Sequence, residues 1–180
     1  MKSFRFRLRP TKKQARALEA QLEECRWLYN HFLDQRKTTY NETGKSLSRY
    51  KQQRELPQLK LSRPTLTLVY AQVLQDVAGR VDGAFRSFFR RCKVGAKPGY
   101  PRFKSFHRYD SLTFPQAPKG CELRNGFLWL FSVGPIKIVI HRKIEGELKT
   151  CTIKRSTTGK WYASFSCKVA KISAGISRLV

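Results

Sequence analysis

The residues best suited to chemistry lie between Phe85 and Gln116, where basic and aromatic side chains are interspersed. Between Asp82 and Asp110 there are eight Lys or Arg and no acidic residue. Lysine and arginine neutralise phosphates, and flat rings can stack on bases or anchor a loop. A basic run is often only a solvated face, but this one lacks acidic partners throughout. It therefore favours nucleic acid as the partner.

The aromatic residues of this stretch fall into two groups. Phe85, Phe88 and Phe89 share one face of a helix end, and we assign them to the core because rings at helical spacing usually pack inside. A loop rich in Gly and Pro then ends the helix. From Tyr100 to Tyr109 rings alternate with basic residues, which is the pattern that suits a polyanion.

No other set of residues suggests a chemical site. The histidines are His31, His107 and His141, and their scatter supports neither a catalytic triad nor a metal cluster. The cysteines are Cys25, Cys92, Cys121, Cys151 and Cys167. Their number is odd and they form no C-x-x-C pair, which argues against zinc and against a disulfide framework and is typical of a reducing cytosol. We predict no catalytic residue, no metal and no cofactor.

The whole chain has the charge of a protein that binds a polyanion. Its 180 residues contain 37 Lys or Arg and 12 Asp or Glu, a formal net charge of +25. A hydrophobic content of 41% is enough for a core in one or two domains. No segment reaches the length of apolar sequence that spans a membrane, and the first residues lack the apolar core of a signal peptide.

Helical patterns occupy the first half of the chain after Pro10. A capping box at Thr11–Gln14 predicts a helix that continues toward Tyr40 and stops by Gly44, with a break near Arg26 left open. A short helix is expected from Ser48 to Leu56, ended by Pro57. The longest apolar stripe predicts a helix from about 65 to 92, so that residues 11–92 form an antiparallel bundle.

Strand patterns flank these helices on both sides. Lys2–Arg9 alternates apolar and basic residues, as a half-buried strand does. Asn125-Gly126 predicts a tight hairpin between strands at 122–124 and 127–130. Further strands are expected at 136–140, 149–155 and 161–169. The predicted fold class is α+β, a small antiparallel β-barrel interrupted by an inserted α-helical bundle.

Six blocks of the sequence occur in order between residues 2 and 170. They are YNHFLDQR, Y-x-E-T-G-K-S-L-S, VLQDV-x-x-R-V-D-x-A-F-x-x-F-F-R-R, K-x-G-x-K-P-G-Y-P-R-F-K, Y-D-S-L-T-F-P-Q and T-I-K-R-x-x-x-G-K-W-Y-A-S-F. Together these blocks resemble TnpB (OrfB), the transposon-encoded RNA-guided nuclease family related to type V CRISPR effectors and often labelled transposase.

The resemblance implies a domain organisation and a role. Residues 1–10 and 111–170 would form a wedge-type β-barrel, and 11–110 a helical recognition domain with a helix-turn-helix-like start. These domains would grip a guide RNA and target DNA next to a short transposon-adjacent motif, while guide pairing supplies most of the specificity. Residues 171–180 would be the remnant of the strand that enters a nuclease domain.

The resemblance also implies two sets of contact residues. The readers of the DNA motif would be Arg49, Tyr50, Gln53, Ala71, Gln75, Thr113, Phe114 and Gln116. A glutamine amide can bond an adenine edge in two places, although Gln75 also suits the exposed side of an amphipathic helix. The contacts to the nucleic-acid backbone, which position without specifying, would be Arg5, Arg7, Arg90, Arg91, Arg102, Lys104, Arg108, Lys154 and Arg155.

One departure from the family pattern concerns catalysis. The RuvC-like nuclease domain of the family begins with a strand that carries a metal-binding Asp in a G-I-D context. This chain reads Gly175-Ile176-Ser177, and a serine hydroxyl is a poor ligand for the cations of two-metal cleavage. We therefore expect a truncated family protein that binds nucleic acid and is inactive as a nuclease alone. An early stop, a gene remnant and a deliberate truncation are all open.

The partners implied are a guide RNA and double-stranded target DNA in a prokaryotic cytoplasm, associated with the nucleoid. One alternative is a split RNA-guided endonuclease, in which a separate RuvC-type polypeptide completes this chain. A second alternative, a general RNA-binding protein of ribosomal type, rests only on charge and aromatic content and predicts no preference for a short duplex motif.

Overall fold

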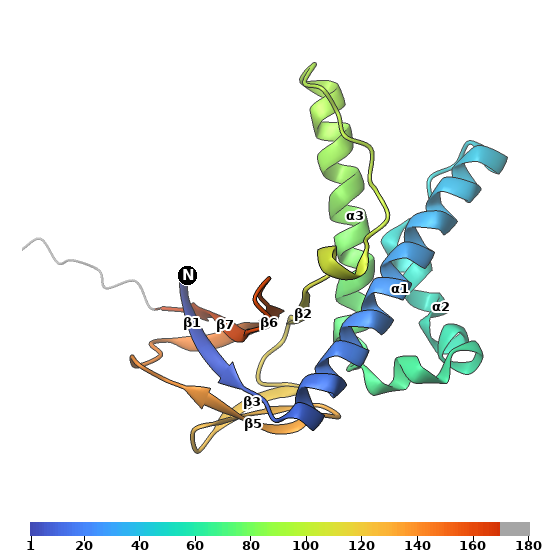
Figure 1. Ribbon diagram of the computed structural model, residues 1–180. Helices are drawn as coiled ribbons and strands as arrows, with labels where there is room; N and C mark the ends of the chain where they lie inside the picture. The colour runs from blue at the N-terminus through green and yellow to red at the C-terminus, as the bar shows by residue number, and fades with distance from the viewer. Residues whose placement is uncertain (170–180) are drawn as a thin grey trace, which may run out of the picture.

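A computed structural model of the protein describes residues 1–169, with a β-sheet and a group of helices side by side (Figure 1). The remnant of a nuclease strand expected at 171–180, Ser177 included, lies outside the described residues. In residues 1–169 no helix is long and apolar enough to cross a membrane.

The sheet has seven strands and curls into a nearly closed antiparallel barrel. The strands are β1 (Lys2–Arg9), β2 (Ser111–Phe114), β3 (Cys121–Arg124), β4 (Phe127–Leu130), β5 (Gly134–Val139), β6 (Glu147–Arg155) and β7 (Trp161–Lys168). Their order is β2-β6-β7-β1-β5-β4-β3. The thiols of Cys121 in β3 and Cys151 in β6 contact each other, so β3, at one end of this order, lies against β6, the neighbour of the strand at the other end. The predicted α+β class, a small barrel with a helical insertion, is confirmed.

Alternation of apolar and polar residues explains the central strands. Phe4, Phe6 and Leu8 of β1 are buried, and the residues between them face outward. Phe4 lies opposite Phe165 of β7 in the antiparallel register. Because side chains of a strand alternate between its two faces, one face of β1 fills the barrel and the other carries Arg5 and Arg7.

The turns and edges of the sheet give one confirmation and one correction. Asn125 and Gly126 have φ of 50° and 76°, as the predicted two-residue hairpin between β3 and β4 requires. β2 was not predicted, because a four-residue strand next to a loop has little local signal. It pairs with β6 at the edge of the sheet and carries the buried Leu112 and Phe114.

The first helix, α1, runs without a break from Lys12 to Thr43. Thr11 and Gln14 form the predicted capping box, and Gly44 ends the helix with φ of 65°. The break considered near Arg26 is absent. The segment has no Gly or Pro between Lys12 and Thr43, and buried residues from Leu18 to Arg36 hold it against the other helices.

The next two helices differ from the sequence prediction at their boundaries. α2 spans Arg49–Ser62 with Pro57 inside it, so Pro57 does not end the helix. Proline removes one backbone hydrogen bond from a helix. Here Pro57 is exposed, and the buried side chains of Gln52 and Leu56 still hold α2 against its neighbours. The η1 turn (Pro64–Leu68) precedes α3 (Ala71–Lys93), because Pro64 begins a tighter turn where a continuous helix was expected.

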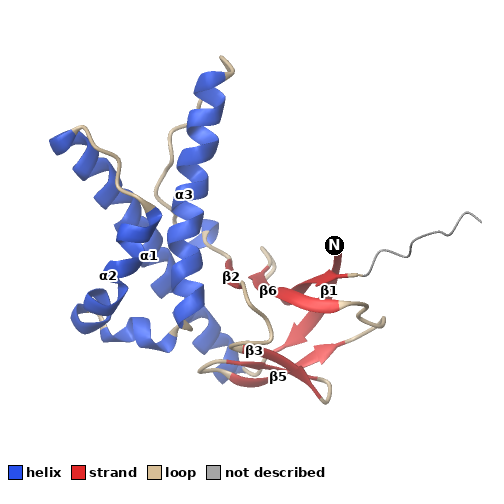
Figure 2. Ribbon diagram, turned by 180° about the vertical axis from the view of Figure 1, so that it is seen from behind, coloured by secondary structure: helices blue, strands red, loops and turns tan. Residues whose placement is uncertain are grey.

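α1 and α3 diverge like the arms of a V, with α2 packed beside them (Figure 2). The chain returns from the end of α3 to β2 through a loop that contains the η2 turn (Phe106–Arg108). The core assignment of the three phenylalanines is wrong for one of them: Phe89 is 53% exposed, whereas Phe85 and Phe88 are partly buried. Beyond Phe85, α3 extends past the bundle that could cover it.

Candidate nucleic-acid interface

The helical part joins the barrel through Arg80 on α3. Its guanidinium is paired with Asp76 at 2.7 Å and donates hydrogen bonds to the carbonyl oxygen of Ser111 and the hydroxyl of Thr113, at 2.9 and 2.8 Å. Burial raises the pKa of Cys25 on α1 to about 12 and the pKa of Tyr109 as well, so both groups stay neutral beside the cation. This junction fixes the position of β2 relative to α3.

Predicted motif readers on two helices lie next to each other. Gln53 of α2 donates a hydrogen bond through its side-chain amide to the backbone oxygen of Gln75 on α3, at 3.0 Å. In the preceding turn of α2, the Arg49 guanidinium lies 4.9 Å from the ring centroid of Tyr50 and donates to its hydroxyl at 3.3 Å. An added Cβ at Gly79 would lie 3.8 Å from Nη1 of Arg49, so α2 begins in close contact with α3.

The end of β2 continues this surface. Gln72 of α3 donates through its side-chain amide to the side-chain oxygen of Gln116, at 2.7 Å. Ala71 and Gln75, both exposed, lie on either side of Gln72 along the helix. The sequence prediction missed Gln72, although its spacing of three from Gln75 places both on one side of α3. We call this surface the amide face; its residues are Arg49, Tyr50, Gln53, Ala71, Gln72, Gln75 and Gln116.

The side chains of two further predicted readers, Thr113 and Phe114, make contacts within the protein. The Thr113 hydroxyl accepts from Arg80 and lies 3.1 Å from the hydroxyl of Thr152. Phe114 is 1% exposed, and its ring stacks on Tyr70 with a centroid separation of 6.1 Å. Burial of Phe114 is incompatible with base contact by its side chain. Phe114 of the T-F-P-Q block is therefore a core residue of the barrel.

Several predicted backbone contacts line a groove between α3 and the loop that returns to β2. Two adjoining cavities of about 340 and 390 Å³ form this groove, and Tyr29 lies in both. We call it the basic groove; its cations are Arg91, Arg102, Lys104 and Arg108. Arg90 is exposed on α3 beside Arg91. Cations from two segments therefore face one channel, as contacts to a phosphate backbone require.

Asn30 of α1 fixes the loop wall of the basic groove. Its side-chain oxygen accepts a hydrogen bond from the backbone N–H of Lys104 at 2.8 Å, and its side-chain N–H donates to the Lys104 carbonyl at 3.0 Å. Arg26 donates to the same carbonyl at 3.3 Å. The loop is thus clamped to α1 at one residue, which orders the neighbouring cations.

The outer face of the barrel carries a third group. The guanidinium carbons of Arg5 and Arg7 lie 4.0 and 5.2 Å from the ring centroid of Tyr162. Lys154 lies opposite Tyr162 in the register of β6 and β7, and its amine is 3.3 Å from Asp110. We call Arg5, Arg7, Lys154 and Tyr162 the barrel patch. Both guanidinium groups lie over the Tyr162 ring. Arg5 is exposed, whereas Nη1 of Arg7 is buried without a hydrogen-bond partner among the described residues.

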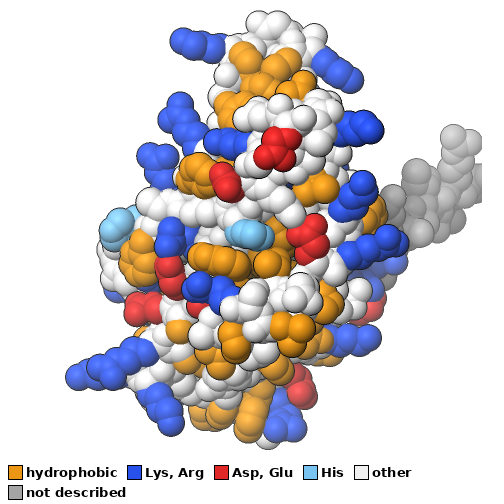
Figure 3. Space-filling model, turned by 90° about the vertical axis from the view of Figure 1, so that its right-hand side faces the viewer, with side chains coloured by type: hydrophobic (Ala, Val, Ile, Leu, Met, Phe, Trp, Pro, Cys, Tyr) orange, Lys and Arg blue, Asp and Glu red, His pale blue; other side chains and the backbone are white. Residues whose placement is uncertain are grey.

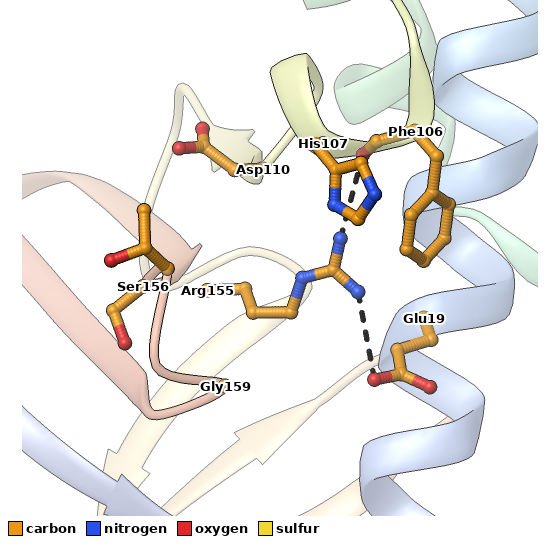
Figure 4. A pocket seen from close by; sticks show the side chains of 8 residues that line it. Glu19, Phe106, His107, Asp110, Arg155, Ser156 and Gly159 are labelled. Atoms are coloured by element: carbon orange, nitrogen blue, oxygen red, sulfur yellow. Dashed lines mark hydrogen bonds and ion pairs between the residues drawn. The ribbon is translucent and has the colours of Figure 1, made fainter.

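Arg155 serves mainly to hold the fold together (Figure 4). Its guanidinium pairs with Glu19 of α1 at 3.6 Å and donates to the carbonyl of Phe106 at 3.4 Å. It also lies 4.4 Å from the ring centroid of Phe106. The pocket of about 460 Å³ around it joins α1, the η2 turn and the turn after β6. With its side chain 11% exposed, Arg155 differs from the other predicted backbone contacts.

The described residues 1–169 hold no cluster of three or more His, Cys, Asp or Glu placed to bind a metal ion. Fold and surface together define a class of α+β protein: a small barrel with a helical insertion, whose cations and amides gather on surfaces that join the two parts.

Comparison with known proteins finds one family model and two relatives. A family model described as a helix-turn-helix domain, HTH_OrfB_IS605, matches residues 1–45. In the structure this range holds β1 and α1, and α2 follows at Arg49. The Escherichia coli (strain K12) protein named "Putative RNA-guided DNA endonuclease InsQ" is 25% identical over 99% of this chain and 46% of its own length. A Streptomyces pristinaespiralis protein named "Putative RNA-guided DNA endonuclease" is 27% identical over 99% of this chain and 47% of its own length.

These matches agree with the resemblance of the ordered sequence blocks to the TnpB (OrfB) family. The chain spans about half the length of the curated relatives that it matches.

Proposed function

We propose that this chain binds a guide RNA together with target DNA beside a short duplex motif. The barrel acts as the wedge-type domain and the helical segment as the recognition domain. The amide face reads the base edges of the motif, and the basic groove and barrel patch hold phosphates. The names of the two relatives, which describe RNA-guided DNA endonucleases, support both nucleic acids as partners.

One observation carries this proposal: readers expected on three separate segments lie on one continuous face. Gln53 contacts Gln75 at 3.0 Å, and Gln72 contacts Gln116 at 2.7 Å. Glutamine amides carry both donors and acceptors, so a row of them can match the donor and acceptor pattern of base pairs in the major groove. A net charge of +25 supplies the affinity that is independent of sequence.

The test is binding to a duplex library with randomised positions, in the presence of the RNA that co-purifies with the protein. We expect enrichment of a short motif by the wild-type chain. Replacing both Gln53 and Gln75 by Ala should relax the motif at one or two positions, and each base that is no longer read should cost about 1–3 kcal/mol of discrimination. Gln58→Ala, on an exposed position further along α2, is the matched control and should leave the motif unchanged.

Two outcomes would contradict the proposal. Equal binding to all flanking sequences would indicate a general RNA-binding protein. Magnesium-dependent cutting of the duplex by the purified chain would contradict a role limited to binding.

A further inference from the structure

The end of α3 and the loop after it expose aromatic rings that the fold leaves uncovered. Phe89, Tyr100 and Phe103 are 53%, 45% and 49% exposed. In Figure 3, hydrophobic side chains gather at the top of the molecule, where α3 ends, with Lys and Arg around them. Contiguous exposed apolar area is costly in water and marks an interaction surface. We call Phe89, Tyr100 and Phe103 the tip cluster.

Neighbouring rings hold the tip cluster in place. Phe88 packs edge-on against Tyr100 with a centroid separation of 5.2 Å, and Phe85 does the same at 5.8 Å. Phe89 packs against Phe88 at 5.3 Å. Phe89 also lies nearly parallel to Phe85, with a centroid separation of 6.4 Å. Rings that are already positioned lose little conformational freedom when a ligand binds.

The charge around the tip cluster identifies the occupant. Eight basic residues and no acidic ones lie between Asp82 and Asp110. Among residues 1–169, only Arg86 of these eight is paired with a carboxylate, that of Asp82 at 3.1 Å. The Lys37 amine lies 4.6 Å from the ring centroid of Phe103 and 5.3 Å from that of Tyr100. Unpaired cations beside exposed rings complement a ligand with both anionic groups and flat apolar faces.

We propose that the tip cluster stacks the unpaired bases of a single-stranded RNA segment, whose phosphates contact Arg90, Arg91 and the cations of the following loop. This inference rests on the proposed function and adds a site to it. Bases inside a duplex cover each other's faces, so unpaired bases are the ones whose faces are open to these rings along a strand. Phe103 also lines the basic groove, so the tip cluster adjoins this groove near the end of α3, which suits a strand that leaves a paired region.

The probes for the test are a 12-nucleotide single-stranded RNA carrying 2-aminopurine and a blunt RNA duplex of the same length. Binding of each is measured across a series of salt concentrations. We expect Phe89→Ala and Tyr100→Ala each to weaken single-strand binding by about 5- to 100-fold, because each removes one ring on which a base stacks. The slope of log K against log salt should stay unchanged, because no phosphate contact is removed. Duplex binding should change by less than twofold.

Matched variants separate stacking from charge and from folding. Phe89→Trp keeps a flat face and should restore both affinity and quenching of 2-aminopurine. Arg90→Ala should reduce the salt slope by about 0.7 while quenching of the bound probe remains. Circular dichroism of Phe89→Ala should match the wild type, because this ring lies outside the core.

An unchanged single-strand affinity in Phe89→Ala and Tyr100→Ala, or an equal loss for the duplex, would overturn the inference while leaving the proposed function intact. Conversion of a wild-type dimer into a monomer by these substitutions, with RNA affinity unchanged, would also overturn it by assigning the rings to a protein interface. If the wild-type chain binds neither probe, the proposed function itself fails.

Discussion

Gly120 is the single residue on which the contact between the start of α3 and the barrel depends most directly. Its φ is 74°, and an added Cβ would lie 2.6 Å from the ring of Tyr70. Tyr70 immediately precedes α3 and packs against Phe114 and Phe131 with centroid separations of 6.1 and 5.5 Å. Glycine therefore allows both the backbone turn and the close approach of this ring.

Gly120→Ala should destabilise the protein by about 2–4 kcal/mol, from backbone strain together with overpacking against Tyr70. Gly126→Ala is the matched control, since its φ is 76° and nothing lies within 4 Å of an added Cβ. That variant should lose only about 1–2 kcal/mol from backbone strain. Urea unfolding of both variants measures the difference. Equal losses would show that Tyr70 yields to the added methyl group.

At the scale of elements, the loop between α3 and β2 depends on α1 for its position. All of residues 91–100 are exposed, so the loop has little core of its own. Asn30 binds both backbone groups of Lys104, and Arg155 holds the carbonyl of Phe106. Two distant elements, α1 and β6, thus place the cations of the basic groove.

Asn30→Ala should release this loop while the helices stay folded. Removal of two hydrogen bonds costs about 1–3 kcal/mol locally, which corresponds to about 5- to 150-fold faster amide exchange in residues 100–108. RNA affinity should fall as well, because binding must then order the loop. Hydrogen exchange followed by mass spectrometry measures the first effect, with the exposed Asn41→Ala as the control. Unchanged protection near Lys104 would contradict the clamp.

A second element-scale feature is the polar network among the three helices. The Arg36 guanidinium, 7% exposed, donates to the side-chain oxygen of Gln52 at 2.9 Å and to Asp82 at 3.3 Å. Burial lowers the pKa of Arg36, and the Asp82 carboxylate opposes that change. Gln52 in turn donates to the backbone of Phe32 at 2.8 Å. The network fixes α2 against α1 and α3, and with it the residues of the amide face.

Across the whole molecule, the excess of positive charge opposes folding and favours binding. A net charge of +25 on 180 residues repels itself, and this repulsion weakens as salt screens it. A bound polyanion removes the same repulsion, and the counterions it releases add to the affinity.

Salt should therefore raise the thermal stability of the free protein and reduce the additional stabilisation that RNA provides. Raising NaCl from 50 to 300 mM (on the order of a twofold change in the screening length) should raise the Tm of the RNA-free protein. The additional stabilisation by RNA should shrink over the same range, because binding weakens with salt. Differential scanning fluorimetry with and without RNA measures both trends. A Tm of the free protein that falls with salt would contradict the role assigned to self-repulsion.

Local patterns in the sequence determined those elements that local interactions stabilise. The alternation in Lys2–Arg9, the capping box at Thr11 and the turn at Asn125-Gly126 predicted β1, the start of α1 and the β3–β4 hairpin. Composition and sequence blocks indicated the family and a polyanionic partner. Each of these signals lies within a short window of the chain or in its total charge, so no tertiary information is needed to detect it.

Only the tertiary structure decided which residues are exposed and which meet. Pro57 stays within a helix because Gln52 and Leu56 of the same helix are buried. Phe89 is exposed because α3 extends beyond the helices that could cover it. The contact of Gln72 with Gln116 joins residues far apart in the sequence. Burial depends on elements that approach from elsewhere in the chain. The periodicity of one helix therefore cannot show at which residue its packing against other elements stops.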